Sequence, residues 1–382
     1  MDLQERLCND HTVYVLGAGF SRAAGIPVVR EFMNELRDTY DWVRRAGEMR
    51  SLEAKGLEAV LAFRLEASAA AFRTEVNVEN IEELFSLASA TNLQGLSAQV
   101  CWAIGATIDR CVQQAGPSLA RRKLHARIGP EGVDPTLMLP IAEQSQGYTR
   151  YLSDDYSLML GIMLGRFSVP RLDRRSTIVT FNYDLLVEEA LSRLGVDFSY
   201  GIEPACRILA PADKFRLSPG AQLNLLKLHG SLNWTRVASP TIFCDYAGVR
   251  ATKRPPLVIP PTWNKVFGKL FTNVWAGAVQ AISTATNIVI LGFSAPETDQ
   301  HFRYLMSAGL RNNISLRAVH VVDIDSGDAF RGRYLRVFRR EMLARRELVF
   351  HEMPAAGFLF SNSSEIGRGL RAGWSVGDPE HV

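Results

Sequence analysis

Five short apolar runs limit the possible folds of this chain more than any other feature. Each run is followed directly by Gly, Asn, His or Asp. The runs are residues 12–16, 177–181, 224–228, 287–291 and 318–322. Continuous apolar runs rich in β-branched residues are typical of parallel strands buried on both faces of a sheet. Segments with helical spacing alternate with them, at residues 29–40, 184–194 and 298–310. We therefore predict an α/β fold, a Rossmann-like doubly wound parallel sheet that binds its ligand at the carboxyl ends of the strands.

A long segment with helical character separates the first apolar run from the second. Apolar residues recur at helical spacing in residues 81–88 and 96–108. The sequence thus predicts a Rossmann domain formed by residues 1–40 and 176–355, a helical insertion at 41–175 and a C-terminal tail at 356–382. The proline-rich residues 236–275 are predicted to form an irregular, stiff loop beside the sheet.

The composition argues against several classes of protein. A formal net charge of +3 over 382 residues is too small an excess to indicate direct nucleic-acid binding. The five cysteines include no Cys-x-x-Cys pair, so we expect neither a metal site nor a disulfide framework, and this favours a cytoplasmic protein. No apolar run approaches the length of a membrane span, so no membrane partner is expected.

The first apolar run leads into a loop of small residues, Gly17-Ala18-Gly19-Phe20-Ser21. Glycines allow a backbone to approach a pyrophosphate, and a helix that begins here would present free N–H groups to it. A Gly-x-Gly sequence after a strand also forms plain tight turns, so the loop alone does not decide the matter. Arg30 could reach a phosphate, or it could be an exposed helix arginine.

The second and third runs are followed by side chains suited to catalysis. Asn182 and Asp184 follow the second run, and His229 follows the third. Near neutral pH an imidazole can accept a proton, an amide can donate and accept hydrogen bonds, and a carboxylate favours developing positive charge. Each residue also has a structural use: His229 as a structural histidine, Asn182 as a turn residue and Asp184 as a helix cap. Their occurrence beside the glycine loop favours the catalytic interpretation.

These segments resemble the signatures of the sirtuin superfamily of NAD-consuming enzymes. Residues 17–21, continued by Gly25-Ile26-Pro27, resemble the first signature, and residues 180–184 resemble the second. Leu228-His229-Gly230 resembles the third, which carries the catalytic histidine. The resemblance implies that Asn182, Asp184 and His229 are catalytic. It also implies a set of NAD-binding residues, namely Gly17, Ala18, Gly19, Phe20, Ser21, Arg30, Gly292, Ser294 and Asp323.

The chain departs from protein-deacylating sirtuins in a way that bears on the second substrate. Those enzymes carry a four-cysteine zinc module after the catalytic histidine, whereas only Cys244 follows His229 here. The resemblance therefore implies no zinc, and water as the acceptor, so that NAD is consumed as a substrate and yields nicotinamide and ADP-ribose.

The pattern, including Asn80-Ile81-Glu82-Glu83-Leu84, is also similar to sirtuin-like effectors of bacterial anti-phage defence. These deplete NAD, often as oligomers and often beside a partner such as a HerA-type ATPase. A homo-oligomer and such a partner are accordingly expected. Two alternatives stay open: an NAD-dependent protein deacylase or ADP-ribosyltransferase, and a scaffold that senses NAD or ADP-ribose without cleaving it.

Overall fold

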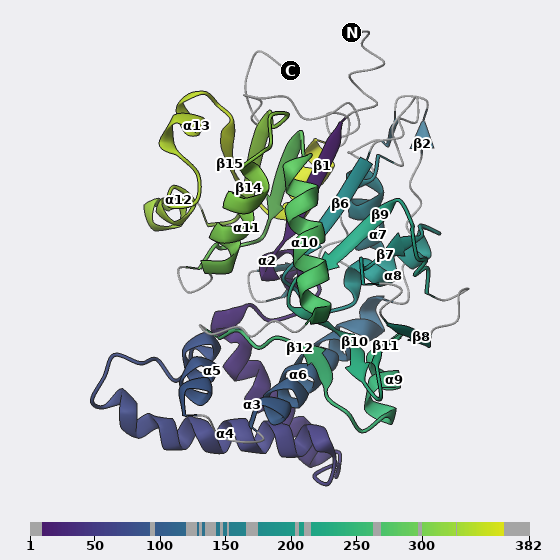
Figure 1. Cartoon of the computed structure of the whole chain (residues 1–382). Coiled ribbons are helices and arrows are strands. Elements are labelled where there is room, and N and C mark those ends of the chain that lie inside the picture. Colours follow the sequence, from purple (N-terminus) through teal and green to yellow (C-terminus); the bar gives the residue numbers. More distant parts are fainter. Residues whose placement is uncertain are drawn as a thin grey trace.

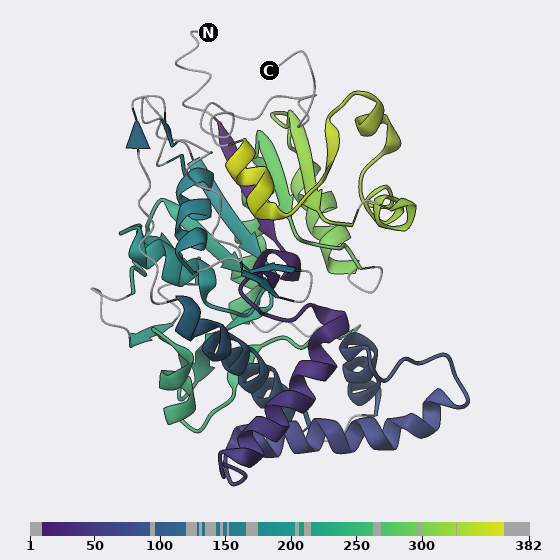
Figure 2. The same cartoon turned by 180° about the vertical axis from the view of Figure 1, so that it is seen from behind.

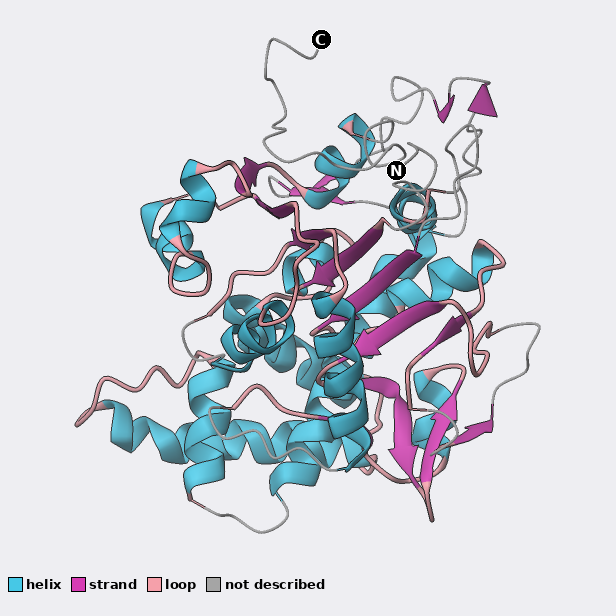
Figure 3. Ribbon diagram, turned by 45° about the horizontal axis from the view of Figure 1, so that its top comes forward, coloured by secondary structure: helices cyan, strands magenta, loops and turns pink. Residues whose placement is uncertain are grey.

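A parallel sheet of seven strands forms the centre of the protein in the computed structural model (Figures 1 and 3). The structure describes residues 10–91, 96–119, 128–129, 132–133, 143–145, 148–150, 153–165, 175–202, 206–209, 215–262, 269–296, 300–325 and 327–362. The order across the sheet is β15 (Leu348–Glu352), β14 (Ala318–Asp323), β13 (Asn287–Leu291), β1 (His11–Leu16), β6 (Arg175–Thr180), β9 (Leu223–Lys227) and β7 (Phe198–Ser199). All of these neighbours pair in parallel. Because β1 lies in the middle and the chain winds outward on both sides of it, the predicted doubly wound α/β fold is confirmed.

The five predicted apolar runs are five neighbouring strands of this sheet. They form β14, β13, β1, β6 and β9 with only small shifts of their bounds. Every residue of β13 is buried, which explains why the run has no polar alternation. The sequence did not predict β7 and β15. These are the two edge strands, and only Leu348 and His351 of the five residues of β15 are buried, so β15 does not form one apolar run.

Helices cover both faces of the sheet. On the face seen in front in Figure 1 lie α10 (Lys269–Ser283) and α11 (Gln300–Leu310). On the opposite face, seen in front in Figure 2, lie α7 (Ser153–Met163), α8 (Leu186–Arg193) and α14 (Ala355–Ser361). Two short helices, α12 (Asp328–Tyr334) and α13 (Arg340–Ala344), lie beside the β15 edge. The helices predicted at 184–194 and 298–310 are therefore α8 and α11.

A second group of helices lies at the edge where β1 ends (Figure 1). The short α2 (Ala18–Arg22) follows β1, and the group consists of α3 (Val29–Arg45), α4 (Leu52–Ala71), α5 (Ile81–Ala90) and α6 (Leu96–Leu119). Asn80 begins α5, because its Oδ1 accepts a hydrogen bond from the Glu82 N–H at 2.9 Å.

The predicted domain limits fall inside helices and strands and not between them. The helix α3 crosses the limit at residue 41, and α7 packs against α8 and α14 of the sheet domain. Two hairpins also fall in the predicted insertion, β2 (Ile128–Gly129) with β3 (Gly132–Val133) and β4 (Glu143–Ser145) with β5 (Tyr148–Arg150). The predicted tail begins inside α14, and its residues 363–382 lie outside the described residues. The division into domains stays a prediction.

A second sheet replaces much of the irregular loop predicted at residues 236–275, so that prediction was wrong. Its order is β12 (Pro256–Val258), β10 (Gly230–Arg236), β11 (Pro240–Phe243) and β8 (Arg207–Leu209), with α9 (Tyr246–Ala251) packed against it (Figure 3). The prolines suggested a loop, but Pro240 and Pro256 are each the first residue of a strand. Proline is tolerated at that position because a missing N–H there disturbs the ladder least.

Gly292, which follows β13, needs to be glycine for two reasons. Its φ of 62° is rarely adopted by other residues, and an added Cβ would lie 2.3 Å from the backbone nitrogen of Phe20. We expect Gly292→Ala to lower the free energy of unfolding by about 2–4 kcal/mol, measured by urea denaturation. Gly47 is a matched control, because its φ is 75° but a Cβ would meet nothing within 4 Å. Equal losses in Gly292→Ala and Gly47→Ala would contradict the packing argument.

Candidate functional site

The carboxyl ends of five neighbouring strands bring the predicted site residues to one edge of the sheet. In sheet order, Asp323 ends β14, Gly292 follows β13, Gly17 follows β1, Asn182 lies beyond β6 and His229 lies beyond β9. Neighbouring strands are about 4.8 Å apart, so this edge extends over roughly 19 Å. The order of the strands reverses between β1 and β13, which is the place where doubly wound sheets bind ligands.

The glycine loop after β1 packs directly against the turn after β13. The Gly17 N–H donates to the Leu291 carbonyl at 3.0 Å, and the Gly19 N–H donates to the Gly292 carbonyl at 2.8 Å. A Cβ at Gly17 would lie 2.5 Å from the Gly292 oxygen. The glycines thus allow two backbones to approach each other, while Gly19 remains exposed and Ala18 half-buried at the sheet edge.

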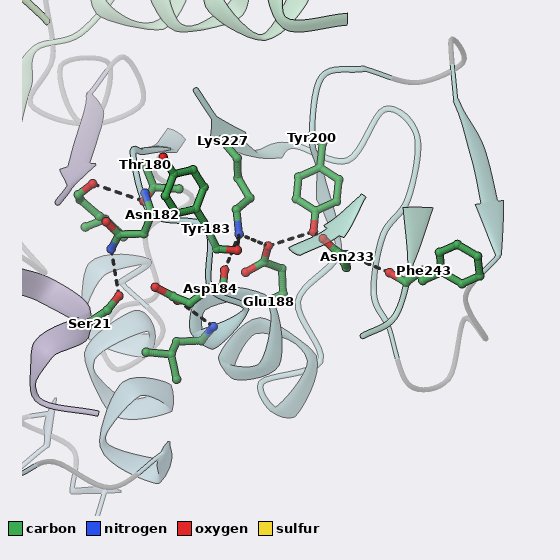
Figure 4. A network of polar contacts seen from close by, with 12 residues as sticks. Ser21, Thr180, Asn182, Tyr183, Asp184, Glu188, Tyr200, Lys227, Asn233 and Phe243 are labelled. Carbon is green, nitrogen blue, oxygen red and sulfur yellow. Dashed lines mark hydrogen bonds and ion pairs between the residues drawn. The ribbon is translucent and has the colours of Figure 1, made fainter. Parts of the chain in front are cut away.

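Phe20 and Ser21 point into the protein rather than outward. The Phe20 ring packs edge-on against Tyr156 of α7 with 5.4 Å between ring centroids, and its carbonyl accepts from the Tyr156 hydroxyl at 2.8 Å. Ser21 is also buried. Phe20 could therefore contact a ligand only through its backbone, while the Ser21 hydroxyl faces Asn182 (Figure 4).

Asn182 is tied to the glycine loop by its side chain. Its Nδ2 donates to the Gly17 carbonyl at 2.9 Å. It also donates to the Ser21 hydroxyl at 2.9 Å (Figure 4). A carbonyl can only accept, so the nitrogen of the amide must face Gly17. The carbonyl oxygen Oδ1 of Asn182 is left as an acceptor for a ligand or a water molecule.

His229 is 5% exposed and lies among aromatic rings. Its ring is 5.1 Å from the Phe181 ring, edge-on, and 6.4 Å from the Tyr183 ring, centroid to centroid. The backbone here is fixed, because the Ile259 N–H donates to the His229 carbonyl at 2.8 Å. The Tyr183 hydroxyl donates to the Ile259 carbonyl at 2.7 Å, so Ile259 connects the segments that carry Asn182 and His229.

Asp184 is 4% exposed and lies two residues before α8, whose N-cap is Leu185. Its Oδ1 accepts from the Leu186 N–H at 3.2 Å, so its side chain bonds to the turn that leads into the helix and does not occupy the N-cap position (Figure 4). The remaining predicted residues are spread toward the β14 side and α3. Ser294 is exposed, with its carbonyl accepting from Arg333 Nε at 2.8 Å, and Arg30 is exposed in the first turn of α3. Burial raises the pKa of the Asp323 carboxyl.

A buried ion pair that was not predicted from the sequence lies behind the site. Lys227 Nζ lies 2.8 Å from Glu188 Oε1, and both side chains are 1% exposed. The Tyr200 hydroxyl donates to the same carboxylate oxygen at 2.9 Å, and burial raises the pKa of Tyr200. A lysine between two leucines, Leu226 and Leu228, was the signal that could have revealed this pair.

Comparisons with known proteins give a family match over part of the chain. Residues 176–337 match the family model described as SIR2-like domain. This match begins at β6 and includes Asn182, Asp184, His229, Gly292 and Asp323, while the glycine loop after β1 lies before it. None of the curated proteins matches the sequence significantly.

Among solved structures, the chain is similar to a Sir2 homologue in complex with NAD, with 14% identity and a TM-score of 0.39 over 96% of this chain and 94% of that chain. It is also similar to Sir2 in complex with the inhibitor EX-527, 2′-O-acetyl-ADP-ribose and a deacetylated p53 peptide. There the identity is 12% and the TM-score 0.37, over 97% of this chain and 100% of that chain. Within the part of the chain that the structure describes, no helix is both long and apolar enough to cross a membrane.

Proposed function

We propose that this protein is an NAD glycohydrolase, which cleaves NAD to nicotinamide and ADP-ribose. The order of groups along the sheet edge supports this most. Asn182 and His229 lie at one end, the glycine loop lies in the middle, and Gly292 and Asp323 lie at the other end. NAD has the same sequence of parts, a nicotinamide ribose, a pyrophosphate and an adenosine. The SIR2-like match over the segment with Asn182 and His229 supports the same assignment.

In the proposed complex the pyrophosphate lies on residues 17–21, within reach of Arg30, and the adenosine lies toward Gly292, Ser294 and Asp323. The bond between ribose C1′ and the nicotinamide nitrogen breaks, and its electron pair leaves with nicotinamide. Water adds to the C1′ carbon, which has oxocarbenium character, and its proton passes to His229. The products are nicotinamide, ADP-ribose and a proton.

Asn182 and Asp184 have different roles in the proposed reaction. The Asn182 Oδ1, held in place through the bonds of Nδ2, would orient the water or a ribose hydroxyl. The Asp184 carboxylate would stabilise the positive charge that develops on the ribose. Fixed polar groups of this kind are commonly the largest catalytic contribution, because they do not reorganise during the reaction. Water is proposed as the acceptor because the zinc module of protein-deacylating sirtuins needs four cysteines. Cys244 is the only cysteine after His229, so this sequence lacks that module.

A nicotinamide-release assay with mass spectrometry of the products tests the proposal. The full chain would be assayed alone and with the protein encoded next to it. Free ADP-ribose supports hydrolysis, whereas O-acyl-ADP-ribose or a modified protein would mean transfer. Binding of NAD in calorimetry, with no nicotinamide released under either condition, would mean a sensing scaffold and would overturn the proposal.

The biological setting is proposed on the resemblance alone. We infer a cytoplasmic effector of anti-phage defence that acts by NAD depletion, assembles as a homo-oligomer and works with a partner such as a HerA-type ATPase. Native mass measurement of the chain, alone and co-expressed with its neighbour, checks assembly. A monomer that neither binds the neighbour nor lowers cellular NAD during infection would contradict this setting.

Ser21→Ala offers a test of how Asn182 is oriented. The substitution removes one of the two acceptors of Asn182 Nδ2, so we expect kcat to fall about tenfold, with the KM for NAD nearly unchanged. Ser68→Ala is a matched control, because the Ser68 hydroxyl donates to the Arg64 carbonyl at 3.0 Å in α4, away from the site. A parental kcat in Ser21→Ala would show that this hydrogen bond does not matter for catalysis.

A further inference from the structure

We propose that Lys227 is a positioning residue, which fixes the turn carrying Asn182 relative to the strand end carrying His229. Glu188 is its counter-charge. The inference deepens the proposed function and rests on it for the activity measurement only. Lys227 contacts neither NAD nor the reacting atoms in this proposal, and acts through the backbone of the turn.

The contacts of Lys227 connect two neighbouring strands at the site. Lys227 is the last residue of β9, two residues before His229. Its ammonium donates to the Tyr183 carbonyl at 3.4 Å and to the Asp184 carbonyl, and these two residues directly follow Asn182 (Figure 4). A single side chain from the His229 strand therefore holds the turn that begins at the end of β6.

The ammonium group suits this position because it has three donors and three acceptors surround it. These acceptors are the carbonyls of Tyr183 and Asp184 and the Oε1 of Glu188. A buried charge is tolerated only when it is paired and hydrogen-bonded. A protein in which apolar residues of similar volume replace a buried ion pair is often equally stable or more stable. Stability alone therefore explains the Lys227–Glu188 pair poorly. An apolar pair could not, however, hold the backbone carbonyls of the turn.

Glu188 is itself held by groups from outside the catalytic edge. Its Oε1 accepts from the Tyr200 hydroxyl, whose oxygen accepts from Asn233 Nδ2 at 3.2 Å. Asn233 Nδ2 also donates to the Phe243 carbonyl of β11 at 2.8 Å. The second sheet is therefore connected through Asn233, Tyr200 and Glu188 to Lys227 and the turn (Figure 4). The Leu232 N–H also supports the turn, because it donates to the Tyr183 carbonyl at 3.1 Å.

The test removes both charges together, because removing one would leave the other buried and unpaired. The variant is Lys227→Met with Glu188→Gln in the full chain. We expect a urea midpoint close to that of the parent, a kcat for nicotinamide release lower by about 10–100-fold and a KM changed by no more than about threefold. The matched control is Arg110→Met with Glu35→Gln, another ion pair (3.0 Å) that joins α6 to α3, which should keep the parental kcat.

Hydrogen exchange measured by mass spectrometry gives a readout that does not depend on activity. We expect the amides of residues 181–187 to exchange about tenfold faster in the double variant, and at the parental rate in the control. Unchanged exchange in 181–187 would overturn the proposal, and so would faster exchange with a parental kcat. If the parent releases no nicotinamide under any condition, the proposed function fails, while the exchange result still decides whether Lys227 holds the turn.

Tyr200→Phe provides a second variant should the double substitution prevent folding. It removes one bond to Glu188 and leaves both charges in place. We expect smaller effects in the same direction as in the double variant. The kcat should be lower by about threefold with an unchanged KM, and the amides of residues 181–187 should exchange modestly faster. A parental kcat together with parental exchange in this variant would overturn the proposal.

Discussion

Replacing Asn182 or His229 with alanine is expected to lower nicotinamide release by about 10²–10⁴-fold while the fold is retained. Asn182→Ala removes the amide that lies beyond β6, and His229→Ala removes the imidazole that lies beyond β9. Both side chains act at the reacting ribose in the proposed mechanism, so the main loss should be in kcat. His229 is buried beside Phe181 and Tyr183, so its removal is also expected to lower the free energy of unfolding. The measurement is nicotinamide release from NAD in the active assembly, with circular dichroism and urea denaturation as checks of folding.

The opposite edge of the sheet supplies matched controls for both substitutions. Asn313 Nδ2 donates to the carbonyls of Ile282 at 2.6 Å and Ala285 at 2.9 Å, so Asn313→Ala removes comparable bonds far from the proposed site. His11 is a buried histidine at the first residue of β1, and His11→Gln controls for His229→Ala. A parental rate in Asn182→Ala or His229→Ala would refute the assignment of that residue.

Lowering the pH from 8 to 5 is expected to destabilise the fold by about 6 kcal/mol through three buried histidines. Burial lowers the pKa of His11 and of His351 to about 4, and that of His320 to about 3. The nearby charges of Arg175 and His351 lower the pKa of His11 and His320 further. At pH 5 the folded protein keeps all three neutral, while the unfolded chain binds a proton at each below about pH 6.5.

The direction of the effect follows from these pKa values. Between about pH 6.5 and 4 the unfolded state binds more protons than the folded state, so stability falls as the pH falls. Each histidine contributes about 1.4 kcal/mol per pH unit in this window. The stability is complete well above pH 6.5 and decreases steadily toward pH 4. Carboxyl groups whose pKa is raised, such as Asp323, act in the opposite direction.

A double variant separates the contribution of the histidines to the pH dependence of stability from that of the carboxyl groups. His320 Nδ1 and His351 Nε2 are 3.0 Å apart, and their rings stack with 5.3 Å between centroids, beside Phe358 of α14. We expect His320→Leu with His351→Phe to remove about two thirds of the histidine contribution to the pH dependence. The measurement is the free energy of unfolding in urea at several pH values. The same pH dependence in the parent and the double variant would contradict this account.

The sequence predicted the central strands and the place of the site because both depend on local pattern. A parallel strand covered on both faces is mostly apolar, so β1, β6, β9, β13 and β14 could each be recognised alone. The residues after these strands could also be assigned, since parallel strands end at a common edge. Asn182 and His229 were therefore expected near the glycine loop before any contact was known.

Contacts between distant residues could not be predicted in this way. Ser21 and Asn182 are 161 residues apart, and only the folded chain places the hydroxyl against the amide. The strands of the second sheet are short and are defined by their pairing with one another, so no local pattern marked them. The prolines in this part of the sequence therefore led to the prediction of a loop. The edge strands β7 and β15 likewise lack the continuous apolar run that marks a fully covered strand.

The α/β class, five strands and the side chains that follow them could be predicted from the amino-acid sequence, because burial on both faces of a sheet imposes a local apolar pattern. The order of the strands and the contacts that hold those side chains arise only on folding. A buried ammonium such as Lys227 is stable only where folding brings Glu188 and two backbone carbonyls around it. No local pattern carries that information, because the partners come from different elements of the chain.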